Sequence, residues 1–372
     1  MRTSIRPTIA EVSLGAIRRN VSRVEAVVGD VPVWAVIKAD AYGHGAVTVA
    51  RALAGRTEGL AVSLVEEGLE LRAAGIDAPI AVLGAYYDRC HAQVVDENLM
   101  PVVYDPSDLD RFSEVATKRR RVVGVHLKVD TGMNRLGIHP AELPGVLERA
   151  AALTGVRIAG LCTHFPSADA VAEDDTRAAL ARFLACVAEA EGRGLGPLVN
   201  HAANSAAAVR FPGARLGAVR PGLALYGAMP SAAVALPGLE PALRLSTRIM
   251  AIHAVSAGSA VSYGGLWRAP RDSRIATLPI GYADGYPRHV RDASTLLRDR
   301  RAPIVGAVCM DMMMIDATDI PEAAVGDTVI LIGCARGGAE RISVDDLARW
   351  AGTINYEILC GISKRVPRIY KD

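Results

Sequence analysis

Short apolar runs alternate with helix-period stretches along the first two-thirds of the chain. In the clearest of these stretches, Leu180, Phe183, Leu184 and Val187 repeat at i, i+3, i+4 and i+7, the spacing of one helix face. The apolar runs predict buried strands at 32–37, 58–62, 79–83, 100–104, 122–129, 156–162, 197–200 and 215–219. Eight strand–helix alternations favour an α/β fold with a (β/α)8 TIM-type barrel, although a doubly wound sheet could use the same elements.

The pattern changes after about residue 240. Residues 243–255 alternate with period two, as a half-buried strand does. Further apolar runs, separated by Gly and Pro, follow at 274–280, 304–309 and 328–332. We therefore expect residues 1–235 to form the N-terminal barrel and residues 236–372 to form a second, mainly β domain, with the linker near residues 230–240.

Composition limits the classes of protein that the chain can belong to. The 372 residues carry a net charge of +2, which gives no reason to expect binding to nucleic acid or membrane. No run approaches the ~18 apolar residues of a membrane span, and the start of the chain has no apolar signal core, so we expect a cytoplasmic protein. The six cysteines have no metal-like spacing with histidine, and we expect no metal site.

Lys38 is the first residue that suggests chemistry. It follows the apolar run from Val33 to Ile37, and burying its charge there would be unfavourable. Burial lowers a lysine pKa, which suits an amine that must form a Schiff base with an aldehyde. The chain has only five lysines, and only Lys38 and Lys128 follow apolar strands. The simpler alternative is a lysine whose stem lies along the strand end and whose ammonium reaches solvent.

Other polar groups also follow predicted strands, at the barrel end where active sites gather. They include Lys128, His164, His201 and Arg220. Asn204–Ser205 begins a helix after the seventh strand, and Arg220–Leu223 forms a glycine-containing turn after the eighth. These two loops usually bind phosphate in such barrels, although an ordinary helix cap and a plain turn would look the same. A phosphate site together with a Schiff-base lysine indicates pyridoxal phosphate.

At these motifs the chain resembles bacterial alanine racemases, the pyridoxal-phosphate-dependent family with a barrel and a β domain. The likeness runs essentially from end to end of the chain. The motifs that carry it are Ala35–Gly45, Lys128–Gly137, His201–Ala206, Arg220–Gly227, Val261–Gly264, Gly281–Arg288 and Cys309–Asp311. One departure is Ala307, where the family pattern leads us to expect an arginine on the substrate corridor.

The resemblance implies two catalytic bases. Lys38 would hold pyridoxal phosphate and act on one face of the substrate α-carbon. Tyr263 would act on the opposite face and would come from the partner subunit of a homodimer with shared active sites. Racemisation requires this arrangement, because the α-proton leaves one face and returns to the other. Without the resemblance, Tyr263 would be interpreted as a turn tyrosine with its hydroxyl in solvent.

The resemblance also assigns binding roles to residues that match the family motifs. Arg220 would face the pyridine nitrogen, and His164 would lie near the ring and connect Arg220 to Tyr263. Lys128 would be carbamylated and would hold Arg135 beside the cofactor and the substrate carboxylate; alternatively, Lys128 pairs with Asp130. The phosphate would be bound by Tyr42, Asn204, Ser205, Gly222, Leu223 and Tyr356. The substrate carboxylate region would be bound by Met310 and Asp311, again from the partner.

The activity that the resemblance implies is interconversion of L-alanine and D-alanine, supplying D-alanine for peptidoglycan. Three alternatives remain from the sequence alone. A broader amino-acid racemase would accept serine or larger side chains. A decarboxylase of the same barrel-plus-β plan would need a cysteine motif opposite the cofactor, which we do not find. A non-catalytic pyridoxal-phosphate carrier would resemble an isolated barrel, without the long β domain.

Overall fold

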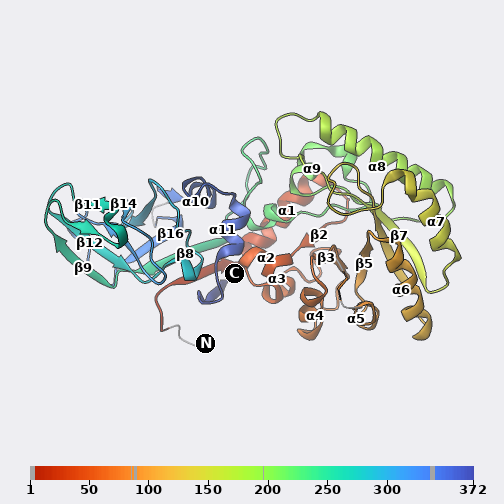
Figure 1. The fold of residues 1–372 in the computed structure, drawn as a ribbon, viewed down its shortest axis with the longest axis horizontal. Helices are drawn as coiled ribbons and strands as arrows, with labels where there is room; N and C mark the ends of the chain where they lie inside the picture. The colour runs from red at the N-terminus through yellow and green to blue at the C-terminus, as the bar shows by residue number, and fades with distance from the viewer. Residues whose placement is uncertain (1–4, 85, 88–89, 196, 336–339) are drawn as a thin grey trace. The chain divides into compact units, whose positions relative to one another are not determined.

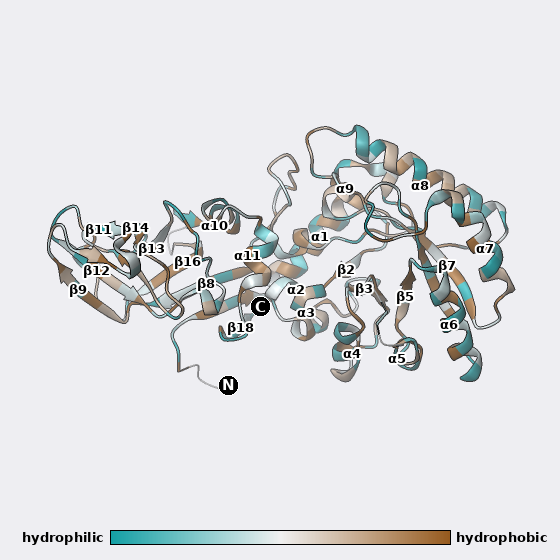
Figure 2. Cartoon of the chain, in the orientation of Figure 1, coloured by the Kyte–Doolittle hydropathy of each residue, from teal (hydrophilic) through white to brown (hydrophobic). Residues whose placement is uncertain are grey.

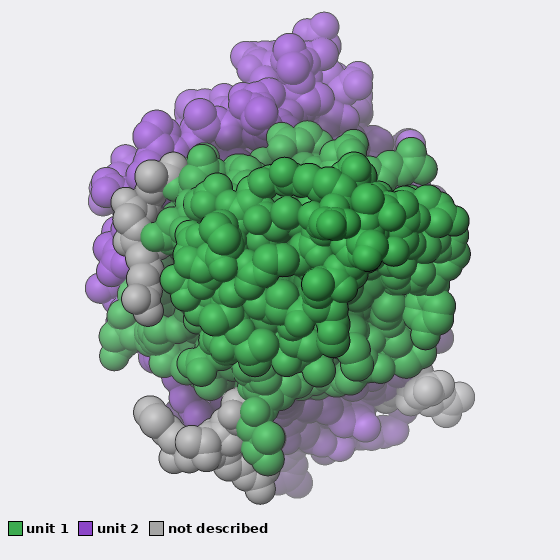
Figure 3. Space-filling view, turned by 90° about the vertical axis from the view of Figure 1, so that its left-hand side faces the viewer, with its two compact units in different colours: residues 1–16, 42–45, 241–372 green, residues 17–41, 46–240 purple. Residues whose placement is uncertain are grey.

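A computed structural model describes residues 5–84, 86–87, 90–195, 197–335 and 340–372. The chain forms two compact units (Figures 1 and 3). Unit 1 comprises Met1–Ala16, Tyr42–Gly45 and Pro241–Asp372, and unit 2 comprises Ile17–Ala41 and Ala46–Glu240. The predicted division of the chain into residues 1–235 and 236–372 stays a prediction.

Unit 2 contains the predicted barrel. Its six longer strands are parallel and lie in chain order: β2 (Trp34–Val36), β3 (Gly59–Val62), β4 (Ile80–Val82), β5 (Met100–Val103), β6 (Val123–Lys128) and β7 (Val156–Cys162). Two short segments complete the ring. Cys162 forms a parallel bridge with His201, and Val219 forms one with Val33. The Gly217 N–H donates to the Asn200 carbonyl at 2.9 Å, which joins the seventh segment to the eighth. Six of the eight predicted strands are therefore confirmed, while the predicted strands at 197–200 and 215–219 are represented only by the single bridges at His201 and Val219. The barrel fold that the eight alternations predicted is nevertheless present.

The helices of this part of the chain cover the strands on their outer side (Figure 1). They are α1 (Leu14–Val28), α3 (Ala46–Leu53), α4 (Val65–Ala73), α5 (His91–Asp96), α6 (Pro106–Lys118), α7 (Leu143–Ala152), α8 (Asp174–Gly192) and α9 (Ser205–Arg210). The short segment α2 (Lys38–Gly43) is instead a left-handed turn that follows the end of β2. Helix α8 carries both polar and apolar residues along its length (Figure 2), and Phe183 and Val187 are buried as predicted. Leu184 is 40% exposed, because the buried face of α8 instead runs through Ala179, Cys186 and Ala190.

Unit 1 is the mainly β unit. Its principal sheet has the strand order β18, β1, β8, β16, β13, β14, β15, β12, β9, with β17 paired to β16. The bounds are β1 (Ile9–Ser13), β8 (Leu243–Arg248), β9 (Ala251–Val255), β12 (Ser273–Leu278), β13 (Ser294–Leu297), β14 (Arg300–Val305), β15 (Met313–Asp316), β16 (Thr328–Cys334), β17 (Arg341–Ile342) and β18 (Arg368–Lys371). A separate hairpin joins β10 (Ala260–Val261) to β11 (Trp267–Arg268), and two helices follow, α10 (Val344–Ala351) and α11 (Asn355–Gly361).

Strand β1 is an element that the sequence pattern did not predict. It pairs with β8 in the antiparallel direction and with β18 in the parallel direction, so the first strand of the chain belongs to the C-terminal sheet. The five residues of β1 are too few to show a clear strand pattern in the sequence, and its partner strands lie more than 200 residues away along the chain. Among the described helices, none combines the length and the apolar character needed to cross a membrane.

An ion pair between the partly exposed Arg6 and the buried Asp284 fixes the chain just before β1. Arg6 donates from both terminal nitrogens to the Asp284 carboxylate at 2.5 Å, and its Nη2 also donates to the Pro279 carbonyl at 2.6 Å. The Asp284 side chain is fully buried, and its Oδ2 also accepts from the Gly281 N–H at 3.0 Å. Burial alone would raise the pKa of Asp284, but these hydrogen bonds lower it overall.

We predict that Arg6→Gln destabilises the protein by about 2–4 kcal/mol, because it leaves a buried carboxylate with a weaker partner. Urea unfolding at neutral pH measures the change. Because the folded-state pKa of Asp284 lies below its unfolded value, the contribution of the pair is present above about pH 4 and is lost as pH falls further. The deficit of Arg6→Gln should therefore shrink on acidification.

Arg19→Gln is the matched control, since Arg19 and Glu240 form a bidentate pair with side chains that are 57% and 45% exposed. We expect it to cost less than about 1 kcal/mol, as exposed ion pairs do. Equal effects of the two substitutions would contradict the anchoring role of Arg6.

Candidate active site

The turn after β2 gives Lys38 an unusual backbone setting. Residues 39–42, none of them glycine, have φ between 52° and 54°. This is the left-handed region, which costs an L-residue roughly 1–2 kcal/mol. Strain of this kind persists where surrounding contacts fix the backbone, and it concentrates at functional sites.

Two carboxylates fix this turn within unit 2. The Ala39 N–H donates to Glu67 Oε1 at 2.6 Å, and Glu67 Oε2 accepts from the Ser63 N–H at 2.7 Å. Asp40 Oδ1 accepts from the Ala46 N–H at the start of α3, at 2.7 Å. Glu67 therefore connects the residue after Lys38 to the end of the neighbouring strand, and the two barrel loops hold each other.

Arg220 is buried at the carboxyl end of the eighth barrel segment. Its Nη1 donates to His201 Nδ1, and its Nη2 donates to the carbonyls of Thr163 and Ala202 at 2.7 and 3.3 Å. None of these bonds uses the Nε–H. Every acceptor in them is neutral, so they orient the guanidinium without cancelling its charge. Burial lowers the pKa of Arg220.

His201 was predicted from its place at a strand end, whereas its neighbour His126 was not singled out from the sequence. His201 Nε2 lies 3.0 Å from His126 Nδ1, and both rings are buried. A signal for His126 was present, because it stands two residues before Lys128 on β6 and alternate residues of a strand face the same side. His126 and Lys128 therefore lie on the same side of β6, with His126 farther from the end of the strand.

His164 lies among four of the predicted site residues. Its pKa is lowered to about 3, first by burial and then by the nearby cations Arg220, Arg135, Lys38 and Lys128. The structure therefore brings these five residues of unit 2 into one electrostatic environment. The bridge from Arg220 through His164 to Tyr263 stays a prediction.

Lys128 is buried at the end of β6, where its Nζ donates to the Leu136 carbonyl at 2.6 Å. Burial lowers the pKa of Lys128, which raises the share of neutral amine. Asp130, the alternative partner for Lys128, hydrogen-bonds to backbone N–H groups of its own loop. Its Oδ1 accepts from the N–H groups of Gly132 and Asn134 at 2.9 and 3.1 Å and so shapes the loop that carries Arg135.

The predicted phosphate loops converge on the Ser205 hydroxyl. Ser205 Oγ accepts from the Gly222 N–H at 3.0 Å and from the Ala224 N–H at 3.3 Å. Leu223 lies between these two donors and begins a 3-10 turn, Leu223–Tyr226. One hydroxyl and two amide groups therefore meet at the start of α9. Asn204 forms the side-chain cap of this helix.

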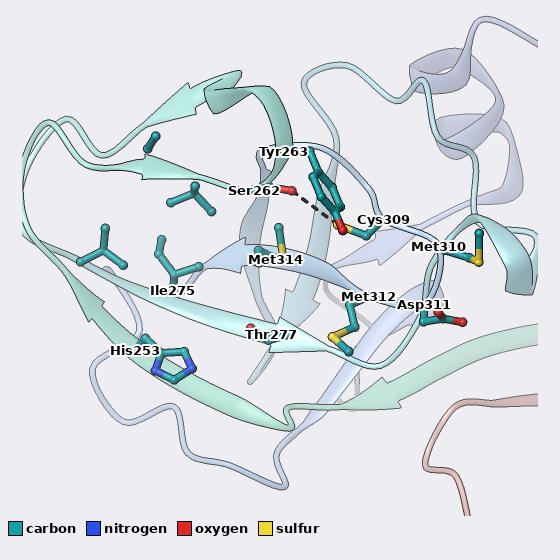
Figure 4. Close-up of a pocket in the computed structure, with 13 residues that line it drawn as sticks. His253, Ser262, Tyr263, Ile275, Thr277, Cys309, Met310, Asp311, Met312 and Met314 are labelled. Carbon is teal, nitrogen blue, oxygen red and sulfur yellow. Dashed lines mark hydrogen bonds between the residues drawn. The ribbon is translucent and has the colours of Figure 1, made fainter.

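The second set of predicted residues lies in unit 1, around a pocket of about 590 Å³ (Figure 4). Tyr263 stands in the turn between β10 and β11, and its exposed fraction is 74%. Met310 and Asp311 line the same end of the pocket as Tyr263, while Ile275 lies toward the other end. The structure thus groups the three residues that were predicted to act from the partner subunit.

The loop that carries Met310 and Asp311 is held closely by its neighbours. A Cβ added to Gly281 would lie 2.2 Å from the Cys309 carbonyl oxygen, so this approach requires glycine. Asp311 accepts from Arg365 at 2.7 Å. Its carboxylate is therefore already paired within unit 1.

Tyr42 and Tyr356, two predicted phosphate ligands, also lie together in unit 1. Their ring centroids are 5.9 Å apart with an interplanar angle of 42°. Tyr42 is buried, and burial, followed by the neighbouring Tyr356, raises its pKa, so its hydroxyl remains a proton donor at neutral pH.

Comparison with known proteins identifies the family of the chain. The family model described as "Alanine racemase, N-terminal domain" matches residues 12–230, and "Alanine racemase, C-terminal domain" matches residues 242–370. The chain belongs to the alanine racemase family. It is an isomerase that racemises alanine, and the predicted resemblance and fold class are confirmed.

Individual members of the alanine racemase family align with nearly the whole chain. Alanine racemase from Sorangium cellulosum (strain So ce56) is 44% identical, with 99% of this chain and 100% of that one covered. The crystal structure of alanine racemase from D-cycloserine-producing Streptomyces lavendulae has a TM-score of 0.94 at 33% identity, covering 100% and 98% of the two chains. The Bacillus anthracis alanine racemase with bound L-Ala-P has a TM-score of 0.91 at 38% identity, covering 100% and 96%.

We predict that Ala39→Gly stabilises the protein by about 0.5–1 kcal/mol, because glycine adopts positive φ without the Cβ penalty. The Ala39 side chain is exposed, so its removal costs little packing. Thermal unfolding measures the change. The matched control is Ala181→Gly in α8, an exposed helical position, where the same substitution should destabilise by about 1 kcal/mol. Destabilisation at both positions would contradict a strained turn after Lys38.

Proposed function

We propose that the chain racemises alanine with pyridoxal phosphate, with Lys38 and Tyr263 as the two bases on opposite faces of the α-carbon. The observation that carries this proposal is that Arg220 is buried and donates only to uncharged acceptors in its hydrogen bonds with His201, Thr163 and Ala202. A guanidinium does not give up its proton, so it disfavours protonation of a ring nitrogen placed against it. Arg220 at that nitrogen would make the bound cofactor a weaker electron sink, which would favour return of a proton to the α-carbon and so racemisation over transamination.

The residues of the chain fit this cofactor. A phosphate suits the Ser205 hydroxyl at the start of α9, because its oxygen accepts from the N–H groups of Gly222 and Ala224 and its O–H is the group that would donate to the anion. Arg220 would face the pyridine nitrogen, and Lys38, which stands just after β2, would hold the aldehyde carbon of the cofactor. We propose that Tyr42 and Tyr356 contribute hydroxyl groups to the phosphate, with Asn204 and Leu223 shaping its loops.

When bound, pyridoxal phosphate supplies the electron sink that stabilises negative charge at the substrate α-carbon. The protein residues decide which bond breaks. Lys38 and Tyr263 each remove or return a proton on one face. Arg135 pairs with the substrate carboxylate and is oriented by a carbamate on Lys128. The carbamate forms when the neutral amine of Lys128 attacks carbon dioxide and releases a proton to solvent, and burial favours that neutral amine.

We propose that the active site is completed by a second copy of the chain. Tyr263 and its neighbours Leu266, Met310 and Met312 are 74%, 78%, 53% and 43% exposed. Exposed apolar side chains clustered around one polar group are typical of a surface that another protein covers. A head-to-tail homodimer would bring Tyr263, Met310 and Asp311 of one subunit to Lys38 of the other.

The cellular setting belongs to the same proposal. A cytoplasmic racemase would supply D-alanine for peptidoglycan, and alanine would be preferred over serine or larger amino acids if Tyr282 and Tyr356 narrow the side-chain pocket. The ligand named for the Bacillus anthracis relative, L-Ala-P, supports alanine as the substrate.

The first test follows the optical rotation of L-alanine by circular dichroism after addition of the protein loaded with pyridoxal phosphate. We expect decay to zero, and a loss of at least about 1000-fold in rate for Lys38→Ala, since a covalent base is removed. Lys364→Ala, an exposed lysine, is the control and should keep full activity. Borohydride reduction followed by peptide mapping should find the cofactor on Lys38. A stable signal from L-alanine, or a label on another lysine, would contradict the proposal.

Mixing two inactive variants tests the shared site. In a dimer of one Lys38→Ala chain and one Tyr263→Phe chain, one site carries both changes and the other carries neither. After unfolding and refolding together, random pairing should restore about one quarter of the wild-type activity, because half of the dimers are mixed and each has one intact site. Each variant treated alone is the control. If Lys38 and Tyr263 acted within one chain, every site would keep a defect and no activity would return.

A further inference from the structure

A chain of three buried side chains runs inward from Arg220 within unit 2. Arg220 Nη1 donates to His201 Nδ1, and His201 Nε2 lies 3.0 Å from His126 Nδ1. His201 and His126 are 0% and 1% exposed. The proposed catalytic steps use neither imidazole, so this arrangement has no role in the mechanism described above.

The geometry fixes the proton on each ring. A guanidinium can only donate, so His201 must present a lone pair at Nδ1. Its one ring proton is therefore on Nε2, which donates to His126 Nδ1. His126 in turn must carry its own proton on Nε2. The direction of every hydrogen bond in the series thus follows from the one group that cannot accept.

We propose that His126 is a positioning residue for the racemase reaction, which acts on Arg220 through His201. By accepting the Nε2–H of His201, it holds the tautomer and ring orientation that leave Nδ1 available to Arg220. Such indirect partners orient a site residue in the way that outer ligands orient the histidines of metal sites. This inference rests on the proposed function of Arg220.

Neutral imidazoles suit this task better than a carboxylate would. Burial lowers the pKa of His126 to about 4, with Arg220 and Arg157 adding to the shift, and burial also lowers the pKa of His201 well below its ordinary value. Both rings are therefore uncharged at neutral pH. A carboxylate behind Arg220 would orient it equally well but would cancel much of the charge that the cofactor nitrogen faces.

The surrounding barrel residues make room for these two rings and enclose them. A Cβ added to Gly160 would lie 2.9 Å from His126 Nδ1 and 2.1 Å from the Val199 carbonyl oxygen, so the space beside the acceptor atom exists because residue 160 is glycine. Trp34 packs against both imidazoles, with centroid distances of 5.6 Å to His126 and 5.5 Å to His201. Its indole covers the rings, and the 3.0 Å bond between them is not shared with solvent.

The tautomers can be measured without any cofactor or catalysis. Nitrogen-15 NMR of histidine-labelled, cofactor-free protein distinguishes a protonated from an unprotonated ring nitrogen. We expect His126 and His201 both to be neutral and protonated on Nε2 between pH 6 and 8, at least about 2 pH units above the lowered pKa of His126. A proton on Nδ1 of either ring, or a charged imidazolium, would overturn the inference even if the protein racemises alanine.

Kinetics of the holoenzyme then test the effect on Arg220. His126→Phe keeps a ring but removes the acceptor, and we expect kcat for alanine racemisation to fall about 10–100-fold with KM changed less than about 3-fold. His126→Asn places an amide oxygen near the former Nδ1 position and should recover kcat to within about 3-fold of wild type. The recovery distinguishes loss of the acceptor from loss of packing.

Tyr86→Phe is the matched control. Tyr86 is a buried barrel tyrosine whose hydroxyl donates to the carbonyls of Val82 and Val102, both at 3.2 Å, and it is not part of the Arg220 series. We expect it to lower the melting temperature without lowering kcat. Unchanged kcat in His126→Phe, or an Asn variant no better than Phe, would overturn the positioning role. Failure of the wild-type protein to racemise alanine would instead overturn the proposed function and leave the NMR result standing.

Discussion

A guanidinium that is buried and yet not neutralised is the constraint on which the rest of the site depends. Arg220 has to be desolvated at the barrel end, and it is bonded there to an imidazole and two carbonyls. Removing a charge from water is unfavourable unless fixed dipoles replace the solvent. These dipoles come from Thr163, directly after β7, and from His201 and Ala202 at the end of the seventh barrel segment. A change in the packing of these barrel segments would therefore also change the electrostatics around Arg220.

The same cationic field explains the state of the neighbouring groups. Burial together with Arg220, Arg135, Lys38 and Lys128 keeps His164 neutral, and burial favours the neutral form of Lys128. A site in which several cations converge is suited to an anionic cofactor and a substrate carboxylate. Tyr263, in contrast, stands exposed on a two-stranded hairpin of unit 1. In the proposed homodimer, the second copy of the chain would cover Tyr263 and place it near Lys38 of that copy.

The sequence was most informative where chemistry and periodicity coincide. Six barrel strands, β2 to β7, were predictable from apolar runs, and Lys38 and Arg220 were predictable as candidates from their places after apolar runs. The seventh and eighth segments form only single bridges, although their apolar runs predicted strands. Strand β1 was not predictable, because its partners β8 and β18 are distant in the chain. The left-handed turn at residues 39–42 was equally hidden, because Glu67 and the Asp40 carboxylate fix it through tertiary hydrogen bonds. His126 escaped notice because a histidine on a strand usually packs in a core, and only the bond to His201 relates it to Arg220.

The central claim is that two different groups handle the α-proton on opposite faces of alanine. The most direct measurement is the isotope content of the first D-alanine formed from protiated L-alanine in deuterated water, followed by mass spectrometry at early times. With Lys38 and Tyr263 as separate bases, the proton taken from one face cannot be returned to the other. The earliest D-alanine should therefore carry solvent deuterium at the α-carbon. Early D-alanine that retains the original protium would show a single base serving both faces and would contradict the account.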